Sequence, residues 1–264
     1  MPIYSHSRIS AYESCPLKYR YRYIDKIRTG KETIEPFLGL RVHETLEKLY
    51  RDVKSGLVPS LPDLLSHLST IWDRRWHSGV RIVRPGRTAE DYRRIGRACV
   101  ETYYKKFVPF DQDRTIGLEH RILIHLDSAG DFKLQGYIDR LAVTPEGVIE
   151  IHDYKTSESL PTQTAIDSDR QLALYQMGVQ DGELEVHRVR LVWHYLRHGE
   201  TLTSEREPKV LADLRRRTLA QAHEIEGATD FPPRETRLCA WCEYLEICPV
   251  WKGRPPPTVS RGRI

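Results

Sequence analysis

The stretch Leu134-Gln-Gly-Tyr-Ile-Asp-Arg-Leu-Ala-Val143, followed by Thr144-Pro-Glu-Gly147 and Val148-Ile-Glu-Ile-His-Asp-Tyr-Lys-Thr-Ser157, decides the expected fold. Both halves are rich in apolar, β-branched and aromatic residues, and the Pro-Glu-Gly segment between them suits a reversal of chain direction. The stretch therefore predicts a β-hairpin around which the rest of the chain is built.

Three charged side chains lie on this hairpin. Asp139 is near the middle of the first strand, and Asp153 and Lys155 lie near the end of the second. Side chains alternate along a strand, so Asp153 and Lys155 share a face while Tyr154 points the other way. Two carboxylates about 4 Å apart repel by about 4 kcal/mol at an effective dielectric of 20, and a divalent cation between them reverses that cost. Oxygen ligands favour Mg²⁺ or Mn²⁺, beside which Lys155 could orient or deprotonate water or hold a phosphate oxygen. An ion pair of Asp139 with Arg140 or Lys155, without further role, is the alternative.

Two predicted helices carry further polar candidates. In the helix 37–54, His43 shares a face with Gly39 and Leu46, a position equally suited to a hydrogen-bonded core histidine. In the helix 168–180, Gln171 and Tyr175 are four residues apart and lie on one side. Glu119, on a strand predicted at 115–126, either reaches the metal or pairs with a neighbouring arginine.

Three cysteines have the spacing Cys239-x₂-Cys242-x₅-Cys248-Pro in a loop-like region. A C-x-x-C pair places two sulfurs on one tight turn, and a third thiolate can close toward the same point. Five cysteines in an intracellular chain of this size argue against a disulfide framework. Cys99 falls on the apolar face of a helix predicted at 88–107 and is expected in the core.

Together, these motifs resemble the PD-(D/E)XK nuclease superfamily in its RecB-like branch. The resemblance rests on Ile138-Asp-Arg, Ile151-His-Asp-Tyr-Lys-Thr156, Gln171-Leu-Ala-Leu-Tyr175 and the upstream His43. The N-terminal pattern Ser7-x₄-Tyr12-x₂-Cys15-Pro16 and the C-terminal cysteines are similar to the iron–sulfur members, which include AddB-type nuclease domains and CRISPR-associated exonucleases. The resemblance extends from Ser5 to Trp251.

The resemblance implies an α/β fold with a restriction-endonuclease-like mixed sheet flanked by helices. It implies that His43, Asp139 and Asp153 hold Mg²⁺ or Mn²⁺, with the Tyr154 carbonyl as a further ligand and Lys155 activating water. It also implies that Gln171 and Tyr175 position DNA. Cys15, Cys239, Cys242 and Cys248 are then the ligands of a [4Fe–4S] cluster, for which zinc is the alternative because both metals suit four thiolates.

The chain is expected to form one nuclease domain over residues 1–252. Within it, 27–113 is a helical insertion, 114–206 the catalytic sheet core, and 207–252 a C-terminal helix with the cysteine segment; 253–264 is expected to be a disordered tail. The net charge is +4, but ten Lys and Arg residues cluster between Arg74 and Lys106, where they could follow a phosphate backbone or form a solvated helical face. With no membrane-length apolar run and no secretory leader, a cytoplasmic protein without membrane contact is expected.

The expected function is a metal-dependent DNA nuclease, an exonuclease trimming single-stranded DNA or DNA ends in recombination, repair or CRISPR adaptation, with protein partners in such a complex. One alternative is a catalytically weak DNA-binding or scaffold subunit that retains the fold and the cluster. Another is a zinc-stapled nuclease that processes RNA.

Overall fold

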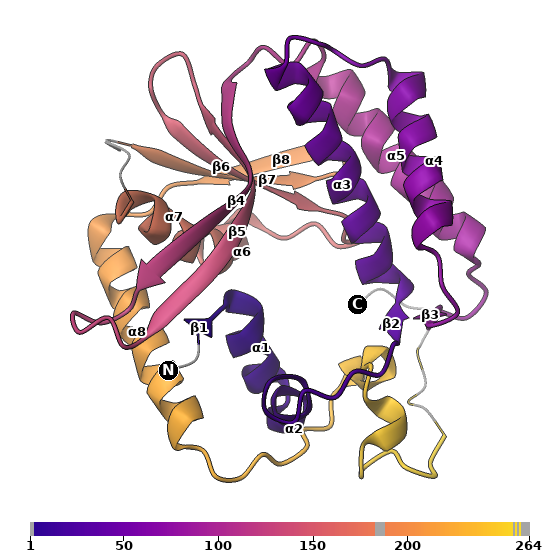
Figure 1. Cartoon of the computed structure of the whole chain (residues 1–264), viewed down its shortest axis with the longest axis vertical. Coiled ribbons are helices and arrows are strands. Elements are labelled where there is room, and N and C mark those ends of the chain that lie inside the picture. Colours follow the sequence, from indigo (N-terminus) through magenta and orange to yellow (C-terminus); the bar gives the residue numbers. More distant parts are fainter. Residues whose placement is uncertain (1–2, 183–187, 256, 258, 260–264) are drawn as a thin grey trace.

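A computed structural model describes residues 3–182, 188–255, 257 and 259 of the chain. Its centre is a mixed sheet in the order β1-β5-β6-β7-β8, with β4 paired to β5 (Figure 1). The strands are β1 (Ile3–Tyr4), β4 (Arg114–His125), β5 (Lys133–Val143), β6 (Ile149–Lys155), β7 (Val189–Tyr195) and β8 (Glu200–Ser204). A mixed sheet flanked by helices is the expected fold class.

The hairpin predicted from the central stretch is confirmed. Strands β5 and β6 pair antiparallel, with Arg140 opposite His152, and the turn between them contains Gly147 at a φ of +82°, a value that glycine adopts without strain. Strand β7 then pairs with β6 in parallel, with Tyr195 opposite Lys155. A parallel pair needs a crossover connection, and the two helices α6 (Gln163–Asp167) and α7 (Gln171–Gln180) provide it.

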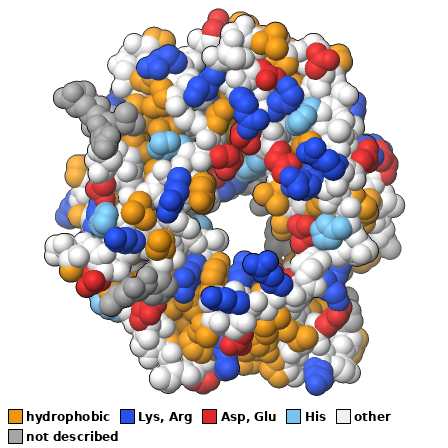
Figure 2. Space-filling view, in the orientation of Figure 1, with side chains coloured by type: hydrophobic (Ala, Val, Ile, Leu, Met, Phe, Trp, Pro, Cys, Tyr) orange, Lys and Arg blue, Asp and Glu red, His pale blue; other side chains and the backbone are white. Residues whose placement is uncertain are grey.

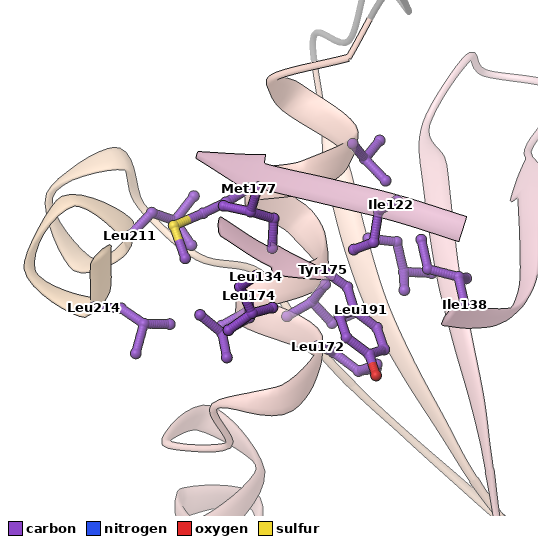
Figure 3. Packing of buried hydrophobic residues seen from close by; sticks show 14 of the residues in the cluster. Ile122, Leu134, Ile138, Leu172, Leu174, Tyr175, Met177, Leu191, Leu211 and Leu214 are labelled. Carbon is purple, nitrogen blue, oxygen red and sulfur yellow. The ribbon is translucent and has the colours of Figure 1, made fainter. Parts of the chain in front are cut away.

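One hydrophobic core lies between the sheet and α7, and the buried side chains of α8 (Pro208–Gly227), such as Leu211 and Leu214, belong to it. Figure 3 shows Ile122 and Leu134 of the β4–β5 hairpin in one cluster with Leu174 and Met177 of α7. A Cβ atom added to Gly178 of α7 would lie 2.9 Å from Ile122, so the absence of a side chain lets this helix lie close to the sheet. The short helix α7, buried almost throughout, is thereby held against the strands that carry the acids.

Three long helices form a second layer with its own core: α3 (Ile34–Lys54), α4 (Leu61–Arg75) and α5 (Ala89–Phe107). The apolar stripe of α3 is buried, including Leu38, Leu46 and Leu49. Helix α5 begins with a capping box in which Thr88 and Asp91 each accept a hydrogen bond from the other's backbone N–H. The tyrosine side chain of Tyr154 on β6 belongs to this second core, so the layer packs directly on the catalytic part of the sheet.

The N-terminal segment differs from the prediction in detail. Helix α1 (His6–Ser14) is capped by Ser5, whose hydroxyl accepts from the Arg8 backbone N–H at 3.1 Å, although the pattern Ser7-x₄-Tyr12 begins two residues later. Helix α2 (Pro16–Tyr19) begins at Pro16 and continues into a π-helical turn, η1 (Arg20–Ile24). Strands β2 (Glu32–Thr33) and β3 (Val80–Arg81) form a short parallel pair. The pair joins the segment before α3 to the segment between α4 and α5.

The C-terminal segment after α8 contains two short 3₁₀ turns, η2 (Arg237–Trp241) and η3 (Leu245–Ile247), which carry the cysteines. Residues 183–187, before β7, lie outside the described residues, as does most of the predicted tail. Helix α6 is not among the helices predicted from the sequence. None of the helices in the described ranges is both long enough and apolar enough to cross a membrane.

Candidate active site

His43 reaches the sheet from the second layer. It lies on α3, and its Nδ1 is 3.4 Å from Oδ2 of Asp139 on β5. Its Nε2 lies 2.7 Å from the backbone carbonyl of Tyr154, to which it donates. The same Asp139 oxygen accepts from the Tyr154 backbone N–H at 2.9 Å. The imidazole, the carboxylate and one peptide unit of β6 therefore form one connected group.

Glu119 joins this group from β4. One ligand atom each of His43, Glu119 and Asp139 lies within 4.8 Å of the others, which makes the three side chains a possible metal site. The backbone of Glu119 has a φ of +44°, in the left-handed region that non-glycine residues seldom occupy. This conformation breaks the alternation of side chains along β4, which is why the pattern of the strand could not place Glu119 in the site.

Asp153 and Lys155 form a pair beside the group. Lys155 Nζ lies 2.6 Å from Asp153 Oδ2, and only 4% of Asp153 is exposed. As expected, the two side chains share one face of β6, because they touch while Tyr154 lies in the second core. Asp153 is not one of the three residues whose ligand atoms lie within 4.8 Å, so in this structure its carboxylate is engaged by the lysine.

Gln171 connects the pair to α7. Its side-chain oxygen accepts from Lys155 Nζ at 3.1 Å, and its amide nitrogen donates to Asp153 Oδ1 at 3.3 Å. The same nitrogen lies 3.4 Å from the hydroxyl of Tyr175. Tyr175 is only 8% exposed and its ring covers Gly136 of β5, so it supports Gln171 from the core side.

Comparison with known proteins gives this arrangement a family. The model of the PD-(D/E)XK nuclease superfamily matches residues 3–249, nearly the whole chain. The chain belongs to the PD-(D/E)XK nuclease superfamily. No curated protein matches it. Among solved structures, one titled "Crystal structure of SSO0001" is similar, with 17% identity and a TM-score of 0.34 over 61% of this chain and 78% of that one.

Membership in this superfamily makes the chain a nuclease, an enzyme that hydrolyses phosphodiester bonds with divalent metal ions. The donors present fit such an ion, since carboxylate oxygens and a neutral imidazole are ligands of Mg²⁺ and Mn²⁺. Of the residues expected at the site, the structure brings together His43, Asp139, Asp153, Lys155 and Gln171. Glu119 also belongs to the group, although the alternation of side chains along β4 did not predict the face from which it projects.

The charges of this PD-(D/E)XK site influence one another. Burial opposes protonation of His43, but Asp139 and then Asp153 favour its charged form, and its pKa rises to about 9. Burial raises the pKa of Asp153, which Lys155 partly opposes. Burial likewise opposes the charge of Lys155, yet Asp153 and Asp139 raise its pKa, so the lysine stays an ammonium at neutral pH.

The site opens into a cleft of about 460 Å³ between α3, the end of β6 and the segment before α5. Figure 2 shows, in addition, an opening through the middle of the nuclease, between α3, the β4–β5 hairpin and α1 as placed in Figure 1. Lys and Arg side chains line the lower edge of this opening, and acidic side chains gather above it. The elements that carry His43 and Asp139 thus border a passage through the molecule.

Some side chains of the basic cluster between Arg74 and Lys106 are engaged by other parts of the protein. Arg93 pairs with Asp73 at 2.9 Å, and Arg81 donates to the backbone carbonyl of Cys242 at 2.9 Å. Arg84 and Arg87, by contrast, line the cleft.

A second group of possible metal ligands lies on the other side of β6: Asp113, Glu150 and His152. The guanidinium of Arg140 is already among them, 2.5 Å from Asp113 and 3.0 Å from Nε2 of His152. Because this buried cation supplies the positive charge, the group is a structural ion-pair network.

The cysteines expected to act as ligands also come together. Cys15, Cys239, Cys242 and Cys248 line one cavity of about 90 Å³, although Cys15 is more than 200 residues from the others in sequence. Cys99 lies apart with 0% exposure, as predicted, and burial raises the pKa of its thiol to about 11.

Proposed function

We propose that this nuclease is a Mg²⁺- or Mn²⁺-dependent deoxyribonuclease that trims single-stranded DNA from its ends. The observation that carries the proposal is the grouping of His43, Glu119 and Asp139 within 4.8 Å, next to the Asp153–Lys155 pair and at the mouth of one cleft. An imidazole and acids from three different elements meet at one point, an arrangement that costs charge repulsion unless a cation is bound there.

The ligands of the ion are His43, Asp139 and Asp153, with Glu119 as a further carboxylate and the Tyr154 carbonyl close by. A bound Mg²⁺ or Mn²⁺ polarises a phosphoryl oxygen and makes a bound water more acidic. Asp153 would help to hold the ion if its carboxylate gave up part of its contact with Lys155. His43 must lose its proton to bind, because only the neutral imidazole has a free lone pair for a metal.

Lys155 acts as a cation in this site, since Asp153 and Asp139 keep its ammonium form at neutral pH. A protonated amine cannot accept a proton from water, so its role is to hold a phosphate oxygen and to stabilise charge that develops there. Gln171 fixes the direction of the ammonium through its 3.1 Å contact. Tyr175 in turn limits the movement of Gln171, and so it acts on the substrate through that residue.

A single strand is the proposed substrate because the site borders an opening through the molecule, along which unpaired DNA can be threaded to the acids (Figure 2). A route that passes through the protein favours free ends over internal positions of a long strand. The assignment to the RecB-like branch and the role in recombination, repair or CRISPR adaptation belong to the same proposal and rest on the motif resemblance alone.

The cysteine cavity is proposed to hold a [4Fe–4S] cluster. Tetrahedral zinc with 2.3 Å bonds would place its thiolates about 3.8 Å apart. Among the described residues, the groups of three possible ligands within 4.8 Å of one another contain no cysteine. The wider spacing of the sulfurs favours a cluster of several irons over a single zinc ion. Its role is to tie Cys15 to the C-terminal segment, a long-range link that stabilises the fold.

Hydrolysis of end-labelled single-stranded DNA with Mn²⁺ tests the function. The double variant Asp153→Ala/Lys155→Ala should lose activity while it keeps the circular dichroism spectrum of the unmodified protein. A loss of about 100-fold or more is expected, the size of effect that a positioned proton or charge donor contributes. Equal activity in both proteins would identify a contaminant and favour the alternative of a DNA-binding subunit without catalysis.

A further inference from the structure

The ion pairs of the catalytic cleft leave some of its charged groups without a partner of opposite charge in the described part of the chain. Three of its acids are paired with a basic side chain, and the fourth, Glu35, accepts from a hydroxyl while its Oε2 is buried without a partner among the described residues. The pairs are Asp139 with His43, Asp153 with Lys155, Glu158 with Arg84, and Glu35 with the hydroxyl of Tyr92. Two guanidinium groups of the lining, those of Arg87 and Arg197, have no carboxylate partner among the described residues. These two guanidinium groups are therefore available to an anion that enters the cleft.

Arg197 is the more constrained of the two. Arg87 is exposed and solvated, whereas Arg197 is half-buried and its Nε is fully buried without a hydrogen-bond partner in the described ranges. A buried donor without a partner costs about 1–3 kcal/mol, more when it is charged. Such a group is retained most readily where a ligand completes it.

The position of Arg197 is fixed by the sheet. It follows β7, whose Tyr195 pairs with Lys155, and the Leu196 backbone N–H donates to the Lys155 carbonyl at 2.9 Å. Arg197 lies in the turn between β7 and β8, and its side chain lines the same cleft as Lys155.

We propose that Arg197 binds a phosphate of the substrate strand that flanks the scissile phosphate, with Arg87 at the rim of the same subsite. The proposal rests on the proposed function and identifies the contact that sets the register of the strand. Lys155 and the metal ligands act on one phosphate, and Arg197, from the turn that follows β7, holds a neighbouring one. Its planar guanidinium can donate two parallel hydrogen bonds to phosphate oxygens, which an ammonium cannot.

Binding of single-stranded DNA in EDTA tests this without hydrolysis. Arg197→Ala should weaken binding about tenfold or more, the usual size of a charge-assisted contact. It should also reduce the slope of log K against log salt concentration by about 0.7, because one phosphate fewer is neutralised. Arg197→Lys should restore the salt slope and recover only part of the affinity. Arg217→Ala, which removes an exposed arginine of α8, is the matched control and should resemble the unmodified protein.

Single methylphosphonate substitutions, which neutralise one phosphate at a time, locate the contact. The unmodified protein should show reduced binding at several positions, and Arg197→Ala should lose the effect at one of them alone, next to the cleaved bond. An unchanged position profile, or an unchanged salt slope, would overturn the role of Arg197 while hydrolysis by the unmodified protein upheld the nuclease. If the unmodified protein neither bound nor cut single-stranded DNA, the proposed function would fail first, and this inference with it.

Discussion

Replacement of Glu119 by glycine should make the metal-free protein more stable and its metal binding weaker. The left-handed backbone at Glu119, with a φ of +44°, costs a non-glycine residue about 1–2 kcal/mol. Glycine removes that cost, and its greater freedom in the unfolded chain takes back about 0.5–1 kcal/mol. The change also removes a carboxylate whose pKa is raised, first by burial and then by Asp139, so a repulsion within the site disappears. The net gain is about 1 kcal/mol.

The same Glu119→Gly substitution should weaken the binding of the metal ion. Loss of a residue that only supports a ligand already weakens metal binding about 10- to 100-fold, so loss of a carboxylate ligand should weaken it at least tenfold. A gain of 1 kcal/mol corresponds to a rise in melting temperature of about 2–4 °C for a chain of this length. Higher stability combined with weaker metal binding would show that the strained backbone at Glu119 serves metal binding and not the stability of the fold.

Two measurements are needed: thermal unfolding in EDTA, and Mn²⁺ titration followed by electron paramagnetic resonance. Lys26→Gly is the matched control, because Lys26 also has a positive φ, of +52°, and is exposed far from the acids in sequence. It should raise stability and leave Mn²⁺ affinity unchanged. A lower melting temperature for Glu119→Gly, or an unchanged Mn²⁺ affinity, would refute the reasoning.

Three other predictions follow from the site and the cysteine cavity. Gly136→Ala should destabilise the protein by about 1–3 kcal/mol in urea unfolding and reduce hydrolysis, because the added Cβ would lie 2.3 Å from the Tyr175 ring. Cys248→Ala should abolish the visible absorption of anaerobically purified protein and lower its melting temperature, whereas Cys99→Ala should keep the absorption. Mn²⁺ affinity should rise with pH up to about 9, because below this pKa His43 must release a proton before it can bind the ion. Calorimetry in buffers of different ionisation enthalpy would detect the released proton. An Mn²⁺ affinity that stays constant from pH 7 to 9 would contradict this prediction.

The central hairpin and the crossover could be predicted from sequence because their signals are local. The Thr144–Gly147 turn and the apolar strands beside it define β5 and β6, and a helix between β6 and β7 supplies the crossover that a parallel pair needs. His43 and Lys155 could be proposed as partners only through family resemblance, since nothing in the periodicity of α3 says which strand it covers.

Other features depend on tertiary context. Strands β1, β2 and β3 have two residues each, too few for alternation to be recognised. The direction of the Glu119 side chain follows from the positive φ of this residue. Glutamate seldom adopts such a φ, so the sequence does not predict it. The Gln171–Tyr175 pair was expected to contact nucleic acid, yet Tyr175 is buried because Gly136 lets its ring approach β5. Sequence gives the spacing of such residues, and packing decides which of them reaches the cleft.

The second layer has a direct part in the chemistry, and Tyr154 shows how. Its peptide N–H donates to Asp139 and its carbonyl accepts from His43, so this one residue orients both ligands. Its side chain points the other way, into the core of α3 and α5, where its ring lies 5.4 Å from those of Tyr103 and His194. Any shift of that core must therefore move the peptide and the helical histidine together. The helical layer thus keeps His43 of α3 within hydrogen-bond distance of the Tyr154 peptide of β6. This explains why long helices pack over a small sheet.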